Sequence, residues 1–124
     1  MRPLNVVVAQ LDPRNSDLLA ASLNRHFRSV AVARSLDELR DAIPKHRAHA
    51  AVVDLEMTGF GSIEDLRRRY PNTNIVCTHR VADEEMWASA LDAGASDVCC
   101  SNDVDAVVHA TLRSLGALSA SKAA

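Results

Sequence analysis

Polar side chains that can bind cations or form hydrogen bonds stand at the ends of short apolar runs in this chain of 124 residues. Asp54 ends one such run and Thr78 ends another, while Asp12 comes just after the first run of the chain. Carboxylates are the protein groups that bind Mg²⁺, usually one or two of them together with water and phosphate oxygens. These residues predict a small polar site if the fold brings the ends of the runs together.

The elements that would position these residues alternate between short β-branched runs and longer stretches with helical periodicity. The expected strands are apolar runs typical of strands buried on both faces: Leu4 to Ala9, Val30 to Ala33, Ala50 to Asp54, Asn74 to Thr78 and Val98 to Cys100. Five strands, each followed by a helix, imply a doubly wound parallel α/β sheet with helices on both faces. Functional residues of such sheets lie at the carboxyl ends of the strands. This rule selects residues 10–12, 54–59, 78–80 and 101–102.

Capping residues and prolines predict where the first two helices begin and end. Pro13 indicates a loop, after which Asn15 or Ser16 caps the first helix. The buried stripe of that helix is expected at Leu19, Leu23 and Phe27. Ser35 opens the second helix as a capping box, and Pro44 is expected to stop it near Ile43 because a residue before proline avoids helical geometry.

The last three helices follow from the same signals. A loop over Thr58 to Gly61 precedes a helix from Ser62 to about Tyr70, and a further helix runs from Ala82 to Ala93 with Gly94 as its cap. The final helix starts at Asn102 or Asp103. Its expected apolar stripe is Val104, Val108, Leu112 and Leu115. Residues 1–117 are expected to form one domain, and residues 118–124 a flexible tail.

Composition limits the classes of function. A net charge of −2 and an aromatic content of 3% give no case for nucleic-acid binding, and the arginines at 67–69 are expected to be a solvated helix face. No apolar run approaches the ~20 residues of a membrane helix. The three cysteines suit a cytoplasmic protein with reduced thiols. Cys77 and Cys99 or Cys100 are expected on adjacent strands, as buried apolar residues or, alternatively, as a redox pair.

Three segments resemble the receiver domains of response regulators (the CheY-like superfamily), and the resemblance covers almost the whole chain. They are Val52 to Gly59 (VVDLEMTG), the expected strand that ends in Thr78, and Ala90 to Asp97 (ALDAGASD). The resemblance implies a (βα)₅ flavodoxin-like fold with strand order 2-1-3-4-5. It makes Asp54 the phosphoryl acceptor and Thr78 the residue that hydrogen-bonds a phosphoryl oxygen. The backbone carbonyl of Glu56 would be a Mg²⁺ ligand.

The sequence departs from that pattern where the family places its charges. The two acids that hold Mg²⁺ in the family fall on Gln10 and Leu11, and only the next residue, Asp12, is acidic. Ser101 stands at the position of the family's lysine, and Val98 at that of its aromatic switch residue. Phosphoryl transfer depends on neutralising the charge of the transferred group. We therefore expect Mg²⁺ to bind weakly, if at all, through Asp12, Asp54 and Glu56, and phosphorylation to be impaired.

These features predict a single-domain receiver protein of bacterial two-component (phosphorelay) signalling, a pseudo-receiver that is not an enzyme beyond at most autocatalytic phosphorylation and autophosphatase activity. Its expected partners are a histidine kinase or another signalling protein, with a homodimer as a further option. Contacts would involve Trp87 and Val98 on the face of the fourth helix, fifth strand and fifth helix. The sequence does not identify the kinase, the target, the pathway, the oligomeric state or a parent protein.

Alternatives remain at each level. The chain could be a fully functional Mg²⁺-dependent acceptor that a histidine kinase phosphorylates at Asp54, if Asp12 or Glu56 leans toward the metal and Arg80 supplies the cation. Asp54 alone could equally be a helix cap, Thr78 a core residue and Asp12 a turn residue before proline. A flavodoxin-like cofactor binder would need a glycine-bearing phosphate loop after the first strand, and residues 10–14 contain no glycine.

Overall fold

The computed structural model describes residues 2–81 and 83–116 fully and the backbone of residues 117–123. Five parallel strands form one sheet in the order β2-β1-β3-β4-β5. The strands are β1 (Arg2–Ala9), β2 (Phe27–Ala33), β3 (Ala50–Asp54), β4 (Asn74–His79) and β5 (Asp97–Cys100). The helices are α1 (Pro13–Asn24), α2 (Leu36–Lys45), α3 (Leu55–Arg69), α4 (Glu84–Ala93) and α5 (Val104–Ala123). The predicted fold class and strand order are confirmed.

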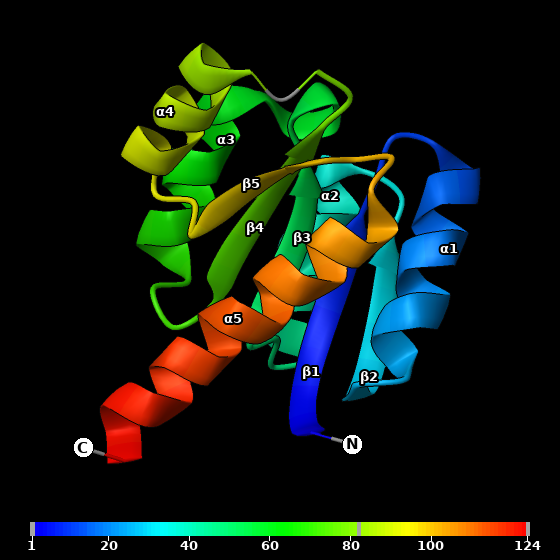
Figure 1. Cartoon of the computed structure of the whole chain (residues 1–124), viewed down its shortest axis with the longest axis vertical. Coiled ribbons are helices and arrows are strands. Elements are labelled where there is room, and N and C mark those ends of the chain that lie inside the picture. The colour runs from blue at the N-terminus through cyan, green and yellow to red at the C-terminus, as the bar shows by residue number, and fades with distance from the viewer. Residues whose placement is uncertain (1, 82, 124) are drawn as a thin grey trace.

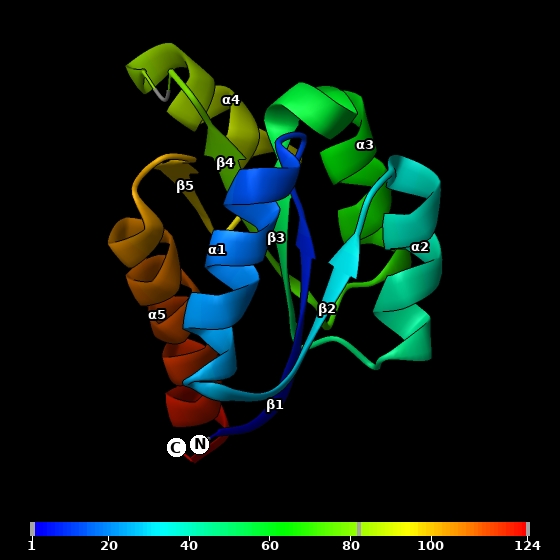
Figure 2. The same cartoon turned by 90° about the vertical axis from the view of Figure 1, so that its right-hand side faces the viewer.

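Helices cover both faces of the sheet, with α1 and α5 on one side and α2, α3 and α4 on the other (Figures 1 and 2). Alternation along the strands divides the core accordingly. Val7 packs toward α2 and α3 and its neighbour Val8 toward α1 and α5, and both are fully buried. Each such buried valine contributes roughly 1.5–3 kcal/mol relative to an exposed one. Because both faces are covered, the sheet leaves only its edges for polar chemistry.

The strand register brings the predicted site residues to one edge. Asp54 pairs with Thr78 across β3 and β4, and Thr78 pairs with Cys99 across β4 and β5. On the other side of β3, Ala9 at the end of β1 pairs with Val53. Parallel strands end at the same edge, so the segments that follow β1, β3, β4 and β5 converge there.

The predicted start of α1 was wrong. Pro13 is the first residue of the helix, where its missing N–H removes no hydrogen bond, and Asp12 is the N-cap. The Asp12 carboxylate accepts a hydrogen bond of 3.0 Å from the N–H of Arg14. The expected stripe was wrong at one position, because Phe27 begins β2, although it is fully buried in the same core as Leu19.

The predicted end of α2 was also wrong, since the helix continues through Pro44 to Lys45. Proline has no N–H for the carbonyl four residues earlier, which here belongs to Arg40. The Tyr70 hydroxyl, at the end of α3, donates to that carbonyl over 3.1 Å. A tertiary contact thus satisfies the acceptor that the proline leaves open.

The remaining helices correct the predicted bounds and confirm two caps. The expected loop over Thr58 to Gly61 is helical apart from a kink at Gly59, where φ is 75°, and α3 begins at Leu55. Gly94 ends α4 at a φ of 116°, as predicted, and the Asp103 side chain caps the start of α5. Residue 82, the expected start of α4, lies outside the described residues. The side chains of the expected tail lie outside them too, so the boundary between the domain and the tail stays a prediction.

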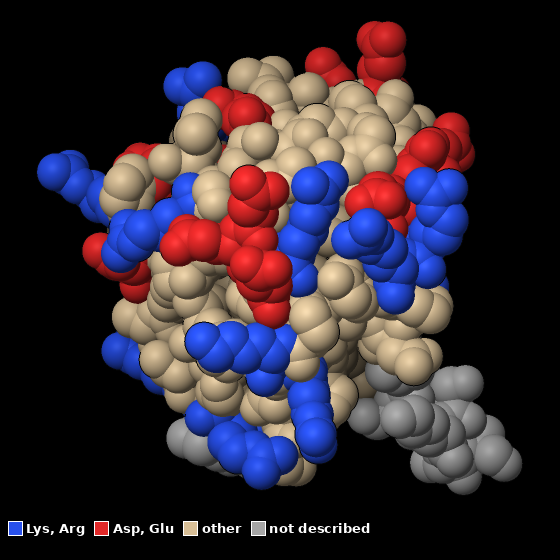
Figure 3. Space-filling view, turned by 180° about the vertical axis from the view of Figure 1, so that it is seen from behind, with Lys and Arg blue, Asp and Glu red and all other residues tan. Residues whose placement is uncertain are grey.

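The face built by α2 and α3 carries charges of both signs across its middle, and mostly basic side chains below them (Figure 3). Asp65 lies at the centre of this network and contacts Arg40, Arg68 and Arg69 at 3.5–3.8 Å. Arg68 and Arg69 are exposed, as expected for a solvated helix face. Across the described residues, no helix is long and apolar enough to span a membrane.

All three cysteines are free thiols. Cys77 belongs to the core between the sheet and α2–α4, whereas Cys99 belongs to the core on the α1–α5 side. The sheet therefore separates these two sulfur atoms, which supports the prediction of buried apolar residues. Burial raises the pKa of Cys77 to about 12 and that of Cys99 to about 11.

Candidate functional site

Asp54 is the last residue of β3 and the N-cap of α3, and its side chain is almost buried at 5% exposure. Oδ1 accepts a hydrogen bond of 3.0 Å from the Glu56 N–H, and Oδ2 accepts one of 3.1 Å from the Leu11 N–H. The carboxylate is thus a helix cap, as one of the alternatives held, and it also fixes the loop after β1. Each of its oxygens already has a backbone partner.

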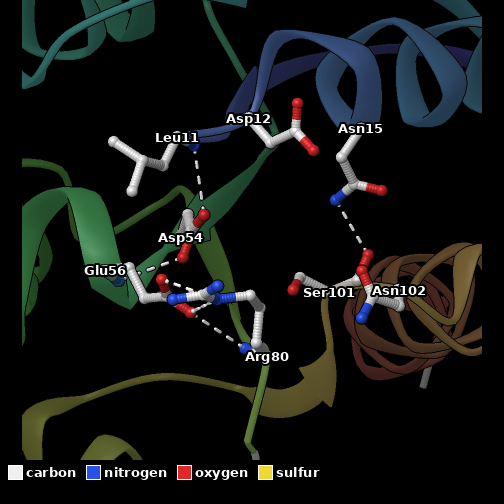
Figure 4. Close-up of a pocket in the computed structure, with 8 residues that line it drawn as sticks. All are labelled: Leu11, Asp12, Asn15, Asp54, Glu56, Arg80, Ser101 and Asn102. Atoms are coloured by element: carbon white, nitrogen blue, oxygen red, sulfur yellow. Dashed lines mark hydrogen bonds and ion pairs between the residues drawn. The ribbon is translucent and has the colours of Figure 1, made fainter.

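A cavity of about 200 Å³ opens beside Asp54 at the carboxyl edge of the sheet (Figure 4). Its lining comes from segments distant in the sequence: Leu11, Asp12, Asn15, Asp54, Glu56, Arg80, Ser101 and Asn102. The structure therefore gathers most of the predicted site residues around one cavity. Three of its side chains are acids, and Arg80 is the basic side chain in this lining.

The side chains around the cavity do not fit a Mg²⁺ ion well. In the part of the chain that the structure describes, no group of three His, Cys, Asp or Glu side chains is arranged to hold a metal. Asp12 is exposed and caps α1, while the Leu11 side chain is 56% exposed and has no ligand atom. Mg²⁺ needs oxygen ligands in near-octahedral geometry. Water would have to supply nearly all of them here.

Gln10 and Thr78 form a buried pair under the cavity, with exposures of 4% and 0%. Gln10 Nε2 donates to the Thr78 hydroxyl oxygen over 3.0 Å, and the hydroxyl lies 3.2 Å from Gln10 Oε1. Thr78 was predicted as the phosphoryl-binding residue; in this structure its hydroxyl contacts Gln10, and the predicted role stays a prediction. Sequence reasoning treated Gln10 only as a lost acid, and its pairing with a residue 68 positions away left no signal in the sequence.

Glu56 and Arg80 close one side of the cavity with an ion pair. Arg80 Nε lies 2.9 Å and 3.0 Å from the two carboxylate oxygens, and its backbone N–H donates to Oε1 over 3.2 Å. These contacts with Arg80 hold the pKa of Glu56 below its ordinary value and raise the pKa of Arg80. The Arg80 side chain is mostly exposed, so solvent weakens the pair.

Asn15 connects α1 to the other side of the cavity. Its Nδ2 donates to the Ser101 carbonyl over 2.8 Å and to Gln10 Oε1 over 3.1 Å. Ser101, at the position expected for a lysine, is 4% exposed and lines the cavity. Serine is uncharged, so it cannot supply the cation that a lysine would bring to Asp54.

The two residues of the expected contact face differ in accessibility. Trp87 is 47% exposed on α4, and it is the only tryptophan in the sequence. Val98, on β5, is 9% exposed and packs into the core beneath α3 and α4. A partner on this face would therefore touch Trp87 directly, but not Val98 in this arrangement.

The fold and the strand order are those of response-regulator receiver domains of known structure. Among solved structures, the RcsB response regulator of Salmonella typhimurium is similar, with a TM-score of 0.79 and 20% identity over 98% of this chain and 62% of that one. A response regulator from Thermotoga maritima gives a TM-score of 0.81 and 17% identity over 91% of this chain and 97% of that one.

NtrX from Brucella abortus gives the highest TM-score of these three, 0.86, at 18% identity over 97% of this chain and 28% of that one. The chain thus spans less than two thirds of the RcsB and NtrX chains. No family model matches the sequence, and no curated protein does. At these identities the likeness shows the fold, and the function has to be argued from the site.

Proposed function

We propose that this chain is a receiver module of two-component signalling that acts by contact with other proteins, with phosphorylation of Asp54 weakened or lost. One observation carries the proposal. Asp54 lines the cavity and stands at the position that the resemblance gives to the phosphoryl acceptor, but acids are missing at residues 10 and 11 and a cation at residue 101. The partner would be a histidine kinase or another signalling protein, and the half-exposed Trp87 on α4 is a suitable contact.

The chemistry of the acceptor step explains the weakening. A phosphoryl group moves from its donor to a carboxylate oxygen of Asp54: an O–P bond forms, and the bond from phosphorus to the donor atom breaks. That atom, an imidazole nitrogen of a phosphohistidine or an oxygen of acetyl phosphate, leaves with the electron pair. Negative charge on the moving group must be neutralised by positive groups held in place beforehand. Arg80 is the cation in the cavity lining, and it already forms an ion pair with Glu56.

The alternative is a working acceptor that a histidine kinase phosphorylates at Asp54. The side chain of Asp54 lies beside an open cavity, and Arg80 could exchange Glu56 for a phosphoryl oxygen without leaving that cavity. The two functions differ in how readily Asp54 is labelled.

Intact-mass spectrometry after incubation with acetyl phosphate and Mg²⁺ separates the two functions. We expect no added phosphoryl group on the wild-type chain. A triple variant, Gln10→Asp, Leu11→Asp and Ser101→Lys, should gain one, and Asp54→Asn in that background should remove it. The triple variant shows that the assay and the fold support labelling. A wild-type gain of one phosphoryl group that is as fast and complete as that of the triple variant, and that Asp54→Asn abolishes, would overturn the proposal in favour of the working acceptor.

A further inference from the structure

The Gln10 side chain joins three elements from a buried position. It belongs to the segment after β1, it contacts Thr78 in β4 at 3.0 and 3.2 Å, and it accepts from Asn15 in α1 at 3.1 Å. Nε2 also donates to the carbonyl of Ala9 over 3.1 Å. These contacts fix the orientation of the amide, because Nε2 must face a carbonyl and Oε1 must face the Asn15 N–H group.

This pairing restricts the orientation of the Thr78 hydroxyl. A threonine hydroxyl has one hydrogen to donate, and here Gln10 Oε1 lies in position to accept it. Both side chains are buried, so water cannot replace the contact if the hydroxyl turns away. Leaving the buried groups unpaired would cost about 1–3 kcal/mol for each.

The segment that follows Thr78 is tied down by further contacts. The Arg80 backbone and side chain both bond to Glu56, and His79 Nδ1 accepts from the Val81 N–H over 3.0 Å. Beyond this segment, α4 begins at Glu84 and carries the half-exposed Trp87. Residues 78–81, which we call the β4–α4 junction, lead from the buried Gln10–Thr78 pair toward α4.

We propose that Gln10 is a positioning residue that holds the β4–α4 junction, and with it the Trp87 face of α4, in a single arrangement independent of phosphorylation at Asp54. The inference rests on the proposed function for its meaning, because it explains how a receiver with a disabled acceptor can still present a fixed binding face. The Gln10–Thr78 contact, which we call the clamp, joins neutral groups and requires neither metal nor phosphate.

Hydrogen–deuterium exchange tests the clamp directly. Gln10→Met keeps the length of the side chain and removes its hydrogen bonds, and Thr78→Val removes the hydroxyl from the other partner. Each variant should raise exchange at the β4–α4 junction about tenfold, and the double variant should be no faster than either single one. The quenching of Trp87 fluorescence by a soluble quencher should change in the same variants. Thr78→Val still tests the pair if Gln10→Met does not fold.

Thr111→Val is the matched control, because the Thr111 hydroxyl is a fully buried donor to the Val107 carbonyl in α5, away from the junction. This variant should reduce overall stability without selective exchange at the junction. If all three variants raise exchange at the junction equally, or if the Gln10→Met and Thr78→Val effects simply add, the clamp is refuted.

Acetyl phosphate treatment keeps the two proposals distinguishable. If wild-type Asp54 is labelled as fast and completely as in the triple variant and exchange at the junction stays unchanged, the proposed function fails and the clamp stands. If labelled chains show altered exchange at the junction, the clamp fails too. With no labelling, the comparison of the three variants decides the clamp alone.

Discussion

Asp54 holds two stretches of backbone at once, because one carboxylate oxygen caps α3 and the other accepts the Leu11 N–H. The cavity beside it is balanced in a similar way, since Arg80, its basic residue, pairs with Glu56. Within this lining Glu56 therefore has a cationic partner, and the carboxylates of Asp12 and Asp54 have backbone N–H donors, before any ligand arrives. At the scale of residues, the site is built from internal contacts that a ligand would have to break.

Removing Arg80 should reduce stability in a pH-dependent manner. Arg80 lowers the pKa of Glu56 in the folded chain, so the ion pair contributes stability above the ordinary pKa of 4.5 and loses it as the pH falls through the lowered value. We expect Arg80→Ala to lower the free energy of unfolding near neutral pH, and the difference from wild type to vanish in acid. Urea denaturation across the pH range measures both.

NMR titration of the Glu56 carboxyl provides the complementary measurement. Its pKa should rise toward the ordinary value in Arg80→Ala and stay low in Arg68→Ala, which removes an exposed arginine outside the cavity lining. An unchanged Glu56 pKa in Arg80→Ala would show that the ion pair is not the cause of the shift.

The residues at the carboxyl edge could be predicted from the sequence to the extent that strand ends determine them. Asp54, Thr78 and Ser101 were expected there, and the register places the first two on adjacent strands. The partner of each was not predictable in this way. The pairs Gln10–Thr78 and Glu56–Arg80 depend on side-chain rotamers between segments distant in sequence, which local patterns do not encode.

At the scale of elements, α2 shows how tertiary contacts override a local rule. Pro44 alone favours a helix end near Ile43, and that expectation failed because Tyr70 supplies a donor to the open Arg40 carbonyl. The prediction of the α1 start failed for a different, local reason, since Pro13 was interpreted as a loop residue although proline is favourable in the first turn. Element order and type were predictable from periodicity, whereas the end of α2 depended on a contact made elsewhere in the chain.

Tyr70→Phe should therefore destabilise the protein by about 1 kcal/mol, because it leaves a partly buried carbonyl without its donor. In a Pro44→Ala background the same change should cost less, since alanine restores the N–H that the Arg40 carbonyl lacks. Chemical denaturation of the four chains completes the cycle. Equal costs in both backgrounds would mean that the hydroxyl does not compensate for the proline.

At the scale of the whole molecule, helices cover both faces of the sheet, and the titration and reactivity of the buried thiols measure how well they exclude water. Cys77 and Cys99 are buried in different cores, and burial raises both of their pKa values. Above the ordinary thiol pKa of 9.0, the unfolded chain releases protons that the folded chain retains. Stability should therefore decrease as the pH rises above that value.

A Cys100→Ser variant makes this measurable, because Cys100 is the partly exposed cysteine of the three. We expect its two remaining thiols to resist alkylation under native conditions and to react at the rate of unfolding in urea. Its free energy of unfolding should fall between pH 9 and the raised pKa values of about 11 and 12. Rapid alkylation of Cys77 without denaturant would contradict the sealed core.

The contact between Gln10 and Thr78 has a consequence for how such a chain could be regulated. An acyl phosphate hydrolyses, so a signal stored in one has a lifetime and must be renewed. A bridge between two neutral side chains is neither consumed nor replenished, and it is present in every folded copy. A face of α4 maintained in this way would carry no transient signal. The cell could change its output only through the amount of the chain, by synthesis or degradation, or through competition for the partner.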